Sequence, residues 1–570
     1  VELIDSTMLD LARSIALFKP TVERYVHGTP AALLVVEFAE SDAAVKQQKL
    51  AELDRMMATL GQGWDKPASD TGGVVTLTEA GDQSRITEMR KSGLNIMMSM
   101  KDEAKPVSFV EDCAVELSDL AEYTDQLTRI FEKYGTMGTW YAHASVGCLH
   151  VRPVLNMKRG EDVAAMRGIA EEAFALVKRY GGSHSGEHGD GIARSEFNEV
   201  MFGPRMAGLF ADVKKLFDPQ NIMNPGKITN APKMDDRHLF RFAPGYKVNS
   251  FPTKLNWSAW PGAAGGLQGA VEMCNNNGSC RKLNGGVMCP SFRVTRNEAD
   301  STRGRANSLR LALSGQLGPD ALASPAMADT MKLCVSCKAC KRECPTGVDM
   351  ARMKIEVTAL QTEKHGLSWH DKLIAYLPDY APYAAALAPL LRLRDLLPGA
   401  AWLSEKITGF TAKRPLPKWQ RNWFRQDELP LQPAADGTPV ILFADTFNRY
   451  LEPENLRAAV RVLQAAGYAV FAPIPEQSNR PLCCGRTFLS TGMVARARSE
   501  ANRLVTTFLP FAKAGVPIVG LEPSCLLALR DELPALLNDD ASRIVAGIAM
   551  TFEELLARDK PALPLKKAAG

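Results

Sequence analysis

Seven cysteines between residues 274 and 344 constrain this chain more than any other feature of its sequence. Four of them form the run Cys334-x2-Cys337-x2-Cys340-x3-Cys344, and Pro345 follows directly. With this spacing, three thiolates hold one iron–sulfur cluster and the fourth reaches another. Zinc sites usually separate two C-x2-C pairs widely, and disulfides would remove the thiolates that iron needs. The spacing therefore predicts a 4Fe-4S cluster and one-electron transfer.

The upstream cysteines supply further ligands but leave one position without a thiolate. Written at the same spacing, the upstream run has Asn277 between Cys274 and Cys280, where a second thiolate would stand. A second cluster would therefore be one ligand short. It could be a three-iron cluster, it could take an oxygen or water ligand, or it could fail to form. The first predicted ligand set is Cys289, Cys334, Cys337 and Cys340, and the second is Cys274, Cys280 and Cys344.

Length and composition indicate a multidomain globular protein. At 570 residues the chain exceeds a single core, so about three or four domains are expected. The net charge of +4, without a run of basic residues, argues against a nucleic-acid partner. Free cysteines in a cluster motif indicate a reducing, cytoplasmic compartment. We expect no membrane span or signal peptide, and the first residue, Val1, lies in running domain sequence, so we expect a fragment.

The pattern along the chain predicts three domains and two linkers. Residues 1–229 mix strand-like and capped helical segments, which is typical of an α+β domain. Residues 230–268, rich in proline and glycine, are a predicted linker. Residues 269–355 are the predicted α-helical cluster domain. The stretch 356–428 is a predicted helical linker broken by prolines. Residues 429–570 restart a pattern of alternating strands and helices, which favours an α/β domain.

Histidines and carboxylates gather in two segments of the first domain. His143 and His150 flank a turn at Gly147, so they can converge on one point. A glycine-rich loop carries four further candidates. Two imidazoles and one carboxylate with an open position are typical of a catalytic divalent metal site, whereas the alternative is a set of hydrogen-bonded loop residues. The loop candidates are His184, Glu187, His188 and Asp190.

The first domain resembles the C-terminal half of FAD-linked oxidases that act on D-2-hydroxy acids, a domain with a ferredoxin-like α+β fold. The motifs that carry the resemblance are HASVGCLHVRP, GEHGDGIARS and LFDPQNIMNPGKI, in the family's order. The family includes dehydrogenases of D-2-hydroxyglutarate and D-lactate and the flavin subunit of glycolate oxidase. The resemblance implies a divalent metal, expected to be zinc, bound by His143, His150 and Glu187, with His188 as the catalytic base.

Two more matching segments, MRKSGL and KPVSFVEDCAV, imply that Arg90 and Lys105 lie near the substrate carboxylate and the flavin. Arg152 stands where some relatives have asparagine, so its role is open. Family members carry further residues ahead of this segment, including the glycine-rich loop that holds the FAD pyrophosphate. Because nothing here matches that loop, most of the FAD site is expected to be absent from this chain.

The later segments extend the resemblance. CVSCKACKRECPTGVDMARMK and STRGRANSLR are similar to the two-cluster ferredoxin-type part of large bacterial enzymes fused to a flavin oxidase. CCGRTF, with Cys483 and Cys484, and EPSC, ending at Cys525, resemble one copy of a cysteine-rich CCG domain. That domain normally occurs twice. A third cluster or a structural thiol pair are the alternatives at this place.

The resemblance implies an oxidoreductase that converts a D-2-hydroxy acid to the 2-oxo acid through FAD. We favour 2-hydroxyglutarate as substrate, with lactate or glycolate as alternatives. Electrons would leave through iron–sulfur clusters to an external acceptor, either a quinone or an electron-transfer protein, and oligomers are possible. The rivals are a non-catalytic electron-transfer subunit that docks on a separate flavoprotein and a scaffold with a structural zinc. Residues 372–425 could lie on the inner membrane surface, although we favour packed helices there.

Overall fold

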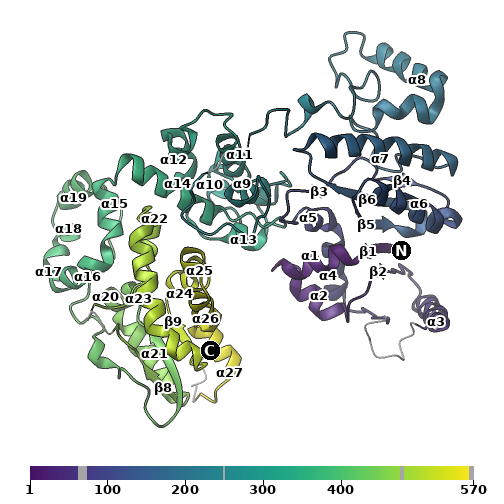
Figure 1. Ribbon diagram of the computed structural model, residues 1–570. Helices are drawn as coiled ribbons and strands as arrows, with labels where there is room; N and C mark the ends of the chain where they lie inside the picture. The colour runs from purple at the N-terminus through teal and green to yellow at the C-terminus, as the bar shows by residue number, and fades with distance from the viewer. Residues whose placement is uncertain (62–72, 248–250, 476–479, 564–570) are drawn as a thin grey trace. The chain divides into compact units, whose positions relative to one another are not determined.

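The computed structural model describes residues 1–61, 73–247, 251–475 and 480–563, which fold as two compact units (Figure 1). The first unit is made up of Val1–Asn249, Trp260–Gln316 and Cys337–Met350. The second is made up of Ser250–Ala259, Leu317–Ser336 and Ala351–Gly570. The predicted cluster segment 269–355 therefore contributes residues to both units. No helix within the described ranges is long and apolar enough to cross a membrane.

The first unit is built around an antiparallel sheet, and its mixture of sheet and helices agrees with the α+β pattern predicted for its first part. Six strands form this sheet among the described residues. All of its strand pairings among the described residues are antiparallel. In sheet order the strands are β2 (Ala32–Val35), β1 (Glu2–Asp5), β5 (Gly138–His143), β6 (Cys148–Leu155) and β3 (Lys105–Pro106), and β4 (Cys113–Ala114) also pairs with β6.

The hairpin between β5 and β6 determines which side chains share a face of the sheet. Gly147 closes the turn with a φ of 66°, and a Cβ there would lie 2.0 Å from the carbonyl oxygen of Val115. Only glycine fits this position. The register places Tyr141 opposite His150. Because successive side chains alternate along a strand, His150 points to the face opposite that of Leu149.

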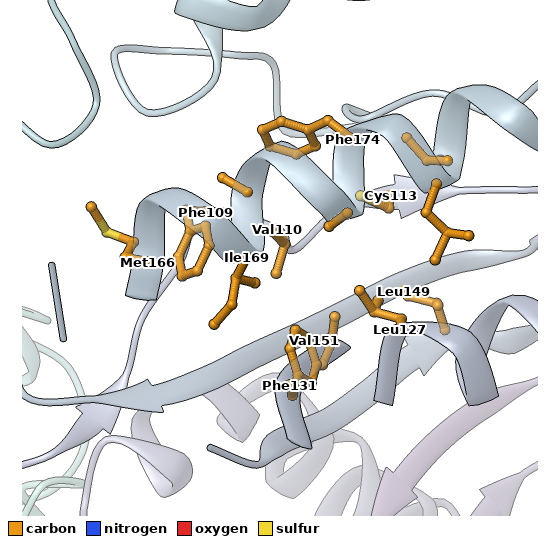
Figure 2. Close-up of a cluster of buried hydrophobic side chains, with 14 of the residues drawn as sticks. Phe109, Val110, Cys113, Leu127, Phe131, Leu149, Val151, Met166, Ile169 and Phe174 are labelled. Atoms are coloured by element: carbon orange, nitrogen blue, oxygen red, sulfur yellow. The ribbon is translucent and has the colours of Figure 1, made fainter. Parts of the chain in front are cut away.

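One face of the sheet is covered by α6 (Leu120–Lys133) and α7 (Gly160–Arg179). Figure 2 shows Ile169 of α7 and Leu149 of β6 within this apolar core. Each large apolar side chain that is fully buried here stabilises the fold by about 1.5–3 kcal/mol. The packing holds β6 in position, and the same strand carries His150 on its other face.

Shorter helices near the start of the chain pack on the other side of the sheet. Their core includes Met8, Val22 and Met89, all buried. Two longer helices contribute little to either core: α3 (Ala43–Thr59) has no buried residue within its described range, and α8 (Asn198–Phe217) has only Asn198. The packed helices are α1 (Ser6–Ser14), α2 (Lys19–Tyr25), α4 (Ala80–Lys91) and α5 (Gly93–Met97).

The cluster segment is helical, as expected for this domain, and its cysteines lie at or near the ends of short helices. Pro290 follows Cys289 and opens a helix, a position where its missing N–H costs nothing. Cys340 lies in another short helix. The helices are α9 (Gly266–Glu272), α10 (Pro290–Thr295), α11 (Thr302–Leu313), α12 (Pro325–Lys332), α13 (Ala339–Glu343) and α14 (Met350–His365).

The predicted helical linker consists of short helices that leave large apolar side chains exposed. Leu396 is 72% exposed and Trp402 is 60% exposed. Packed helices were expected, and the helix over residues 377–386 is packed, with Ala381 and Ala385 fully buried. The helices of four residues are too short to bury a continuous stripe. Prolines mark the starts of two of these helices, Pro378 in one and Pro389 in the next. The helices are α15 (Trp369–Ala375), α16 (Leu377–Ala386), α17 (Ala388–Leu391), α18 (Leu393–Leu396) and α19 (Ala400–Thr408).

The last part of the chain forms a parallel sheet flanked by helices, which agrees with the predicted α/β pattern. Its strands lie in the order β10 (Ala549–Thr551), β9 (Ile518–Gly520), β7 (Thr438–Phe443) and β8 (Tyr468–Phe471). Most residues of β7 and all residues of β8 and β9 are buried, as expected for parallel strands covered on both faces. The described helices are α20 (Thr446–Tyr450), α21 (Pro453–Ala465), α22 (Arg486–Ser490), α23 (Val494–Lys513), α24 (Pro523–Arg530), α25 (Glu532–Leu537), α26 (Asp540–Ile548) and α27 (Phe552–Asp559).

A buried carboxylate fixes an extended segment of the second unit onto α14. Glu356 is 1% exposed and accepts hydrogen bonds from the backbone N–H groups of Lys254 and Leu255 and from the indole N–H of Trp257, each at 2.8 Å. All of these donors lie in the short segment 251–259. A carboxylate that receives three donors satisfies groups that would otherwise be buried without partners.

We expect Glu356→Ala to lower the free energy of unfolding of the second unit by about 2–4 kcal/mol, because it leaves buried donors unmatched. The measurement is thermal or urea unfolding of the purified protein. Glu363→Ala is the matched control on the same helix, since Glu363 forms an exposed ion pair with Lys254 at 2.6 Å. The control should cost about 0.5 kcal/mol or less. Equal effects of the two substitutions would contradict this account.

Candidate functional site

Three imidazoles converge on a single carboxylate oxygen on the face of the sheet opposite α7. The Nε2 atoms of His143, His150 and His188 lie 3.2, 3.1 and 3.3 Å from Oε1 of Glu187. The rings of His150 and His188 stack with centroids 4.8 Å apart, and His143 meets His150 edge-on at 4.9 Å. The structure therefore brings together all four residues that the sequence resemblance assigns to the metal and the catalytic base.

Strand alternation and one glycine-rich loop produce this convergence. His143 ends β5 and His150 lies in β6, and both occupy the face that α6 and α7 leave free. Glu187 and His188 come from the loop that follows α7. In that loop, a Cβ on Gly186 would lie 3.0 Å from the Sγ of Cys148, so the chain passes close to β6.

The carboxylate of Asp112 anchors the loop. It is fully buried and accepts hydrogen bonds from the backbone N–H groups of Glu187, at 2.9 Å, and His188, at 2.8 Å. The hydroxyl of Ser185 donates to it at 3.1 Å. Burial opposes ionisation, but the N–H groups of His188 and Glu187 outweigh it and hold the pKa of Asp112 below its ordinary value. Asp112 is thus an ionised side chain that holds the loop in position below the site.

The donor set fits a divalent metal ion. Burial, together with the charges of His188 and His143, lowers the pKa of His150 to about 4, so its imidazole is neutral near pH 7 and can donate a lone pair. The Nδ1 atom of His150 is buried and has no hydrogen-bond partner among the described residues. Imidazole nitrogens and one carboxylate oxygen are ligands that zinc accepts.

A second, overlapping group of possible ligands shares His150 and Glu187 with this set. The ligand atoms of Asp112, Cys148, His150 and Glu187 all lie within 4.8 Å of one another. However, both oxygens of Asp112 already accept backbone N–H groups, and burial followed by the charge of Asp112 raises the pKa of Cys148 to about 12. We therefore favour the set built from the imidazoles and Glu187.

Arg90 borders the imidazole cluster. Its guanidinium is 3.0 Å from Nδ1 of His143 and forms an ion pair with Glu2. The same His143 nitrogen is 2.8 Å from the Glu2 carboxylate. A guanidinium beside the predicted metal ligands is well placed to bind a carboxylate through two parallel hydrogen bonds. This location agrees with the role that the resemblance implies for Arg90.

Arg152 and Glu111 form a buried ion pair on the same side of the sheet. Arg152 is 3% exposed, and its guanidinium lies 5.6 Å from the ring centre of Tyr141. Glu111 also lies 3.7 Å from Nδ1 of His188. The pair therefore packs against the ring of Tyr141 and places a carboxylate next to His188. The sequence left the role of Arg152 open, and these contacts give it a structural role.

Three sequence candidates, His184, Asp190 and Lys105, lie outside this cluster. His184 is fully buried and packs edge-on against Phe174, with Asp190 3.3 Å away, which is the arrangement of a core histidine. Lys105 contacts the carbonyl of Met100 and, at 3.3 Å, the sulfur of Met273. Lys105 pairs with Leu155, which lies five residues beyond His150 on β6. At the rise of a β-strand, five residues separate Leu155 from His150 by about 16 Å. Burial and then the charge of Lys158 lower the pKa of Lys105 to about 8.

The sequence reasoning missed four residues of the site. Glu2, Glu111, Asp112 and Tyr141 all contact the named candidates or hold them in place. The segment Val110–Ala114 offered a signal, because two adjacent carboxylates interrupt an apolar run there. Charged pairs in such runs are rarely buried unless they are hydrogen-bonded or functional. Glu2 offered no local signal, since only the pairing of β1 with β5 brings it to the site.

Among the cluster cysteines, Cys289 has a polar and positively charged environment. Burial opposes its ionisation, but contacts from Ser291, the backbone of Phe292, Thr302 and the charge of Arg305 outweigh it, so the pKa of Cys289 lies below its ordinary value. Arg305 is fully buried, 3.8 Å from the Cys289 sulfur. A thiolate stabilised in this way is prepared to bind iron.

The other predicted iron ligands differ in exposure. Cys337 is exposed and Cys334 is partly exposed, whereas the remaining five are buried. The hydroxyl of Thr346 lies 3.3 Å from the sulfur of Cys344. Burial, with a smaller contribution from the charge of Cys344, raises the pKa values of both Cys274 and Cys280. The predicted ligands that are buried are Cys274, Cys280, Cys289, Cys340 and Cys344.

A third group of thiols lies in the parallel-sheet domain. Cys483, Cys484 and Cys525 are buried, and the thiol of Cys484 interacts with both of the others. Cys525 lies in α24, just after β9, while Asp445 follows β7, so these groups gather at the carboxyl edge of the sheet. Ligands of open parallel sheets usually bind at that edge.

Comparison with known families finds two matches, one to an oxidase domain and one to an iron–sulfur domain. Residues 1–228 match the model described as FAD linked oxidases, C-terminal domain, and residues 270–348 match the 4Fe-4S dicluster domain. The chain thus joins a FAD-linked oxidase C-terminal domain to a 4Fe-4S dicluster domain. The predicted cluster domain and the predicted first domain are confirmed at this level.

Curated relatives share both parts. A D-2-hydroxyglutarate dehydrogenase of Escherichia coli K12 is 27% identical, and the match covers 100% of this chain and 59% of that protein. The enzyme of the same name from Pantoea ananatis is 27% identical over 95% of this chain and 56% of its own length. For the Pseudomonas putida enzyme the values are 29%, 80% and 48%. The chain therefore spans about half the length of these relatives.

We expect Asp112→Asn to weaken binding of a divalent metal by about 10- to 100-fold, because the amide cannot accept both loop N–H groups and Glu187 loses its fixed position. The measurement is zinc affinity by competition with a chromophoric chelator. Asp162→Asn is the control, since Asp162 accepts the backbone N–H of Asn156 at 2.6 Å away from the site. Unchanged zinc affinity in Asp112→Asn would contradict the anchoring role.

Proposed function

We propose that this chain is the substrate-binding and electron-exit part of an FAD- and iron–sulfur-dependent D-2-hydroxy-acid dehydrogenase. The convergence of His143, His150 and His188 on Glu187, with Arg90 alongside, carries this proposal. D-2-hydroxyglutarate is the favoured substrate because relatives across most of the chain bear that name. Lactate and glycolate are the alternatives.

The site offers separate groups for the two ends of such a substrate. His143, His150 and Glu187 would hold a divalent metal, expected to be zinc, which when bound polarises the substrate hydroxyl. Arg90 would bind the carboxylate next to the reacting carbon. Because Arg90 already contacts His143, the hydroxyl and the carboxylate would be held close together. Lys105 is left for the flavin or the distal end of the substrate.

His188 is the proposed base that removes the hydroxyl proton. Its Nδ1 faces the Glu111 carboxylate at 3.7 Å, which favours a proton on that nitrogen and leaves Nε2 as the acceptor. Glu111 is itself fixed by Arg152. When the proton reaches Nε2, the imidazolium lies between the carboxylates of Glu111 and Glu187, and both stabilise the new charge.

The electrons would then leave through the cofactors of the two matched domains. FAD, when bound, supplies the acceptor for the hydride of the substrate carbon. An iron–sulfur cluster supplies one-electron transfer, and from the spacing we assign Cys289, Cys334, Cys337 and Cys340 to the first cluster. Cys274, Cys280 and Cys344 are the proposed ligands of a second one. An external quinone or electron-transfer protein is the proposed final acceptor.

A non-catalytic electron-transfer subunit is the second candidate, and the cluster domain alone would suit it. Such a subunit has no use for the buried imidazole of His150 and the buried carboxylates of Glu111 and Asp112, which are costly to bury without a function. We further propose a cytoplasmic location and a CCG-type fold for residues 429–570, supported by the gathering of Cys483, Cys484 and Cys525. The exposed side chains of α17–α19 support a peripheral membrane contact over fully packed helices.

We expect His188→Asn in the full-length holoenzyme to lower kcat for D-2-hydroxyglutarate by about 100- to 10,000-fold, because the proton loses its acceptor. The measurement is steady-state reduction of an artificial dye, with zinc content determined on the same samples. Zinc content should stay within error, since His188 is not among the assigned ligands. His238→Asn, which removes an exposed histidine, is the control. Unchanged kcat in His188→Asn would rule out the assigned base.

A further inference from the structure

Two loops of the cluster segment share one backbone conformation. In the loop 334–340, Ser336 and Lys338 have φ values of 53° and 59°. In the loop 274–280, Asn276 and Gly278 have φ values of 64° and 78°. In both loops a left-handed residue therefore stands directly before and directly after the central position. Non-glycine residues rarely adopt this conformation, so three of them in the same two positions indicate a common requirement.

That requirement is the wrapping of a loop around an anion. Left-handed residues in a tight turn direct successive backbone N–H groups into one concavity, and such concavities bind anions, including the sulfides of iron–sulfur clusters. Cysteines at both ends of each loop indicate that both loops bind an iron–sulfur cluster. The loops differ at the centre, where Cys337 in one corresponds to Asn277 in the other. The loop 274–280 thus has the form of a cluster loop without its middle thiolate.

The third sulfur for this loop comes from Cys344. In the run C-x2-C-x2-C-x3-C the fourth cysteine reaches the other cluster, and Cys274, Cys280 and Cys344 are all buried in the first unit. Positive groups border the same loop. Arg241 donates to the carbonyl of Cys274 at 2.9 Å, and Arg303 donates to the carbonyl of Asn276 at 3.3 Å.

The side chain of Asn277 is hydrogen-bonded within its own loop. Its side-chain oxygen accepts the backbone N–H of Ser279 at 2.9 Å, and its amide nitrogen donates to the side chain of Asn275 at 2.6 Å. Both ends of the amide are therefore engaged within the loop, and the residue is exposed. A neutral amide is also a far poorer ligand for iron than a thiolate. The ligand position at the centre of this loop is therefore open to solvent.

We propose that Cys274, Cys280 and Cys344 bind a three-iron cluster, whose missing fourth iron corresponds to the corner beside Asn277. The inference rests on the proposed iron–sulfur assignment and is independent of the substrate. A dicluster domain with two complete four-iron clusters needs eight thiolates, and residues 270–348 contain seven cysteines. Because cluster type is one determinant of reduction potential, the two clusters would differ in potential and give electron flow a direction.

The test is iron analysis and low-temperature EPR of the anaerobically purified full-length holoenzyme, oxidised with stoichiometric ferricyanide. We expect about seven irons in the dicluster domain and the narrow signal of an oxidised three-iron cluster. Asn277→Cys should raise the count by about one iron and abolish that signal. Cys280→Ser should abolish the signal and leave about four irons. These readouts need no substrate turnover, so they separate this inference from the proposed activity.

Asn275→Cys is the matched control, because it adds a thiol to the same loop outside the ligand position. It should leave both the iron count and the signal of the wild type unchanged. Three results would overturn the proposal. These are about eight irons without a three-iron signal in the wild type, about four irons in both the wild type and Cys280→Ser, and a three-iron signal that survives Asn277→Cys.

Discussion

The contact between the Asp112 carboxylate and the loop after α7 is the interaction on which the site depends. The β5–β6 hairpin can place His143 and His150 on one face by strand alternation alone. It cannot supply the carboxylate and the third imidazole, which come from a glycine-rich loop. Asp112 brings them in by accepting the N–H groups of Glu187 and His188. Since these two residues are adjacent, one buried charge sets the position of a proposed ligand and of the proposed base together.

The same arrangement explains where the charged side chains lie around the site. Positive Arg90 lies on the His143 side, and the pair of Arg152 and Glu111 lies behind His188. A substrate anion would therefore meet a positive group at one end and a proton acceptor backed by a carboxylate at the other. This separation is what the removal of a proton next to a bound carboxylate requires.

Much of this was predictable from sequence because it depends on local pattern. The cysteine spacing predicted an iron–sulfur domain that the family match confirms, and the motifs around His143, His150 and Glu187 named side chains that do converge. The remainder depends on long-range pairing. Glu2 reaches His143 only because β1 pairs with β5, and His184, which lies in the same loop as Glu187, turns into the core against Phe174. The leucines of the helical linker are exposed because its helices are short, and sequence periodicity did not predict those lengths.

The central claim is that oxidation of a hydroxy acid at the imidazole cluster feeds electrons into the iron–sulfur domain. Rapid freeze-quench EPR of the anaerobic full-length holoenzyme, mixed with D-2-hydroxyglutarate, tests it most directly. The account predicts that the signals of the clusters change at least as fast as steady-state turnover. Reduction of the flavin with no change in those signals on the timescale of turnover would contradict it.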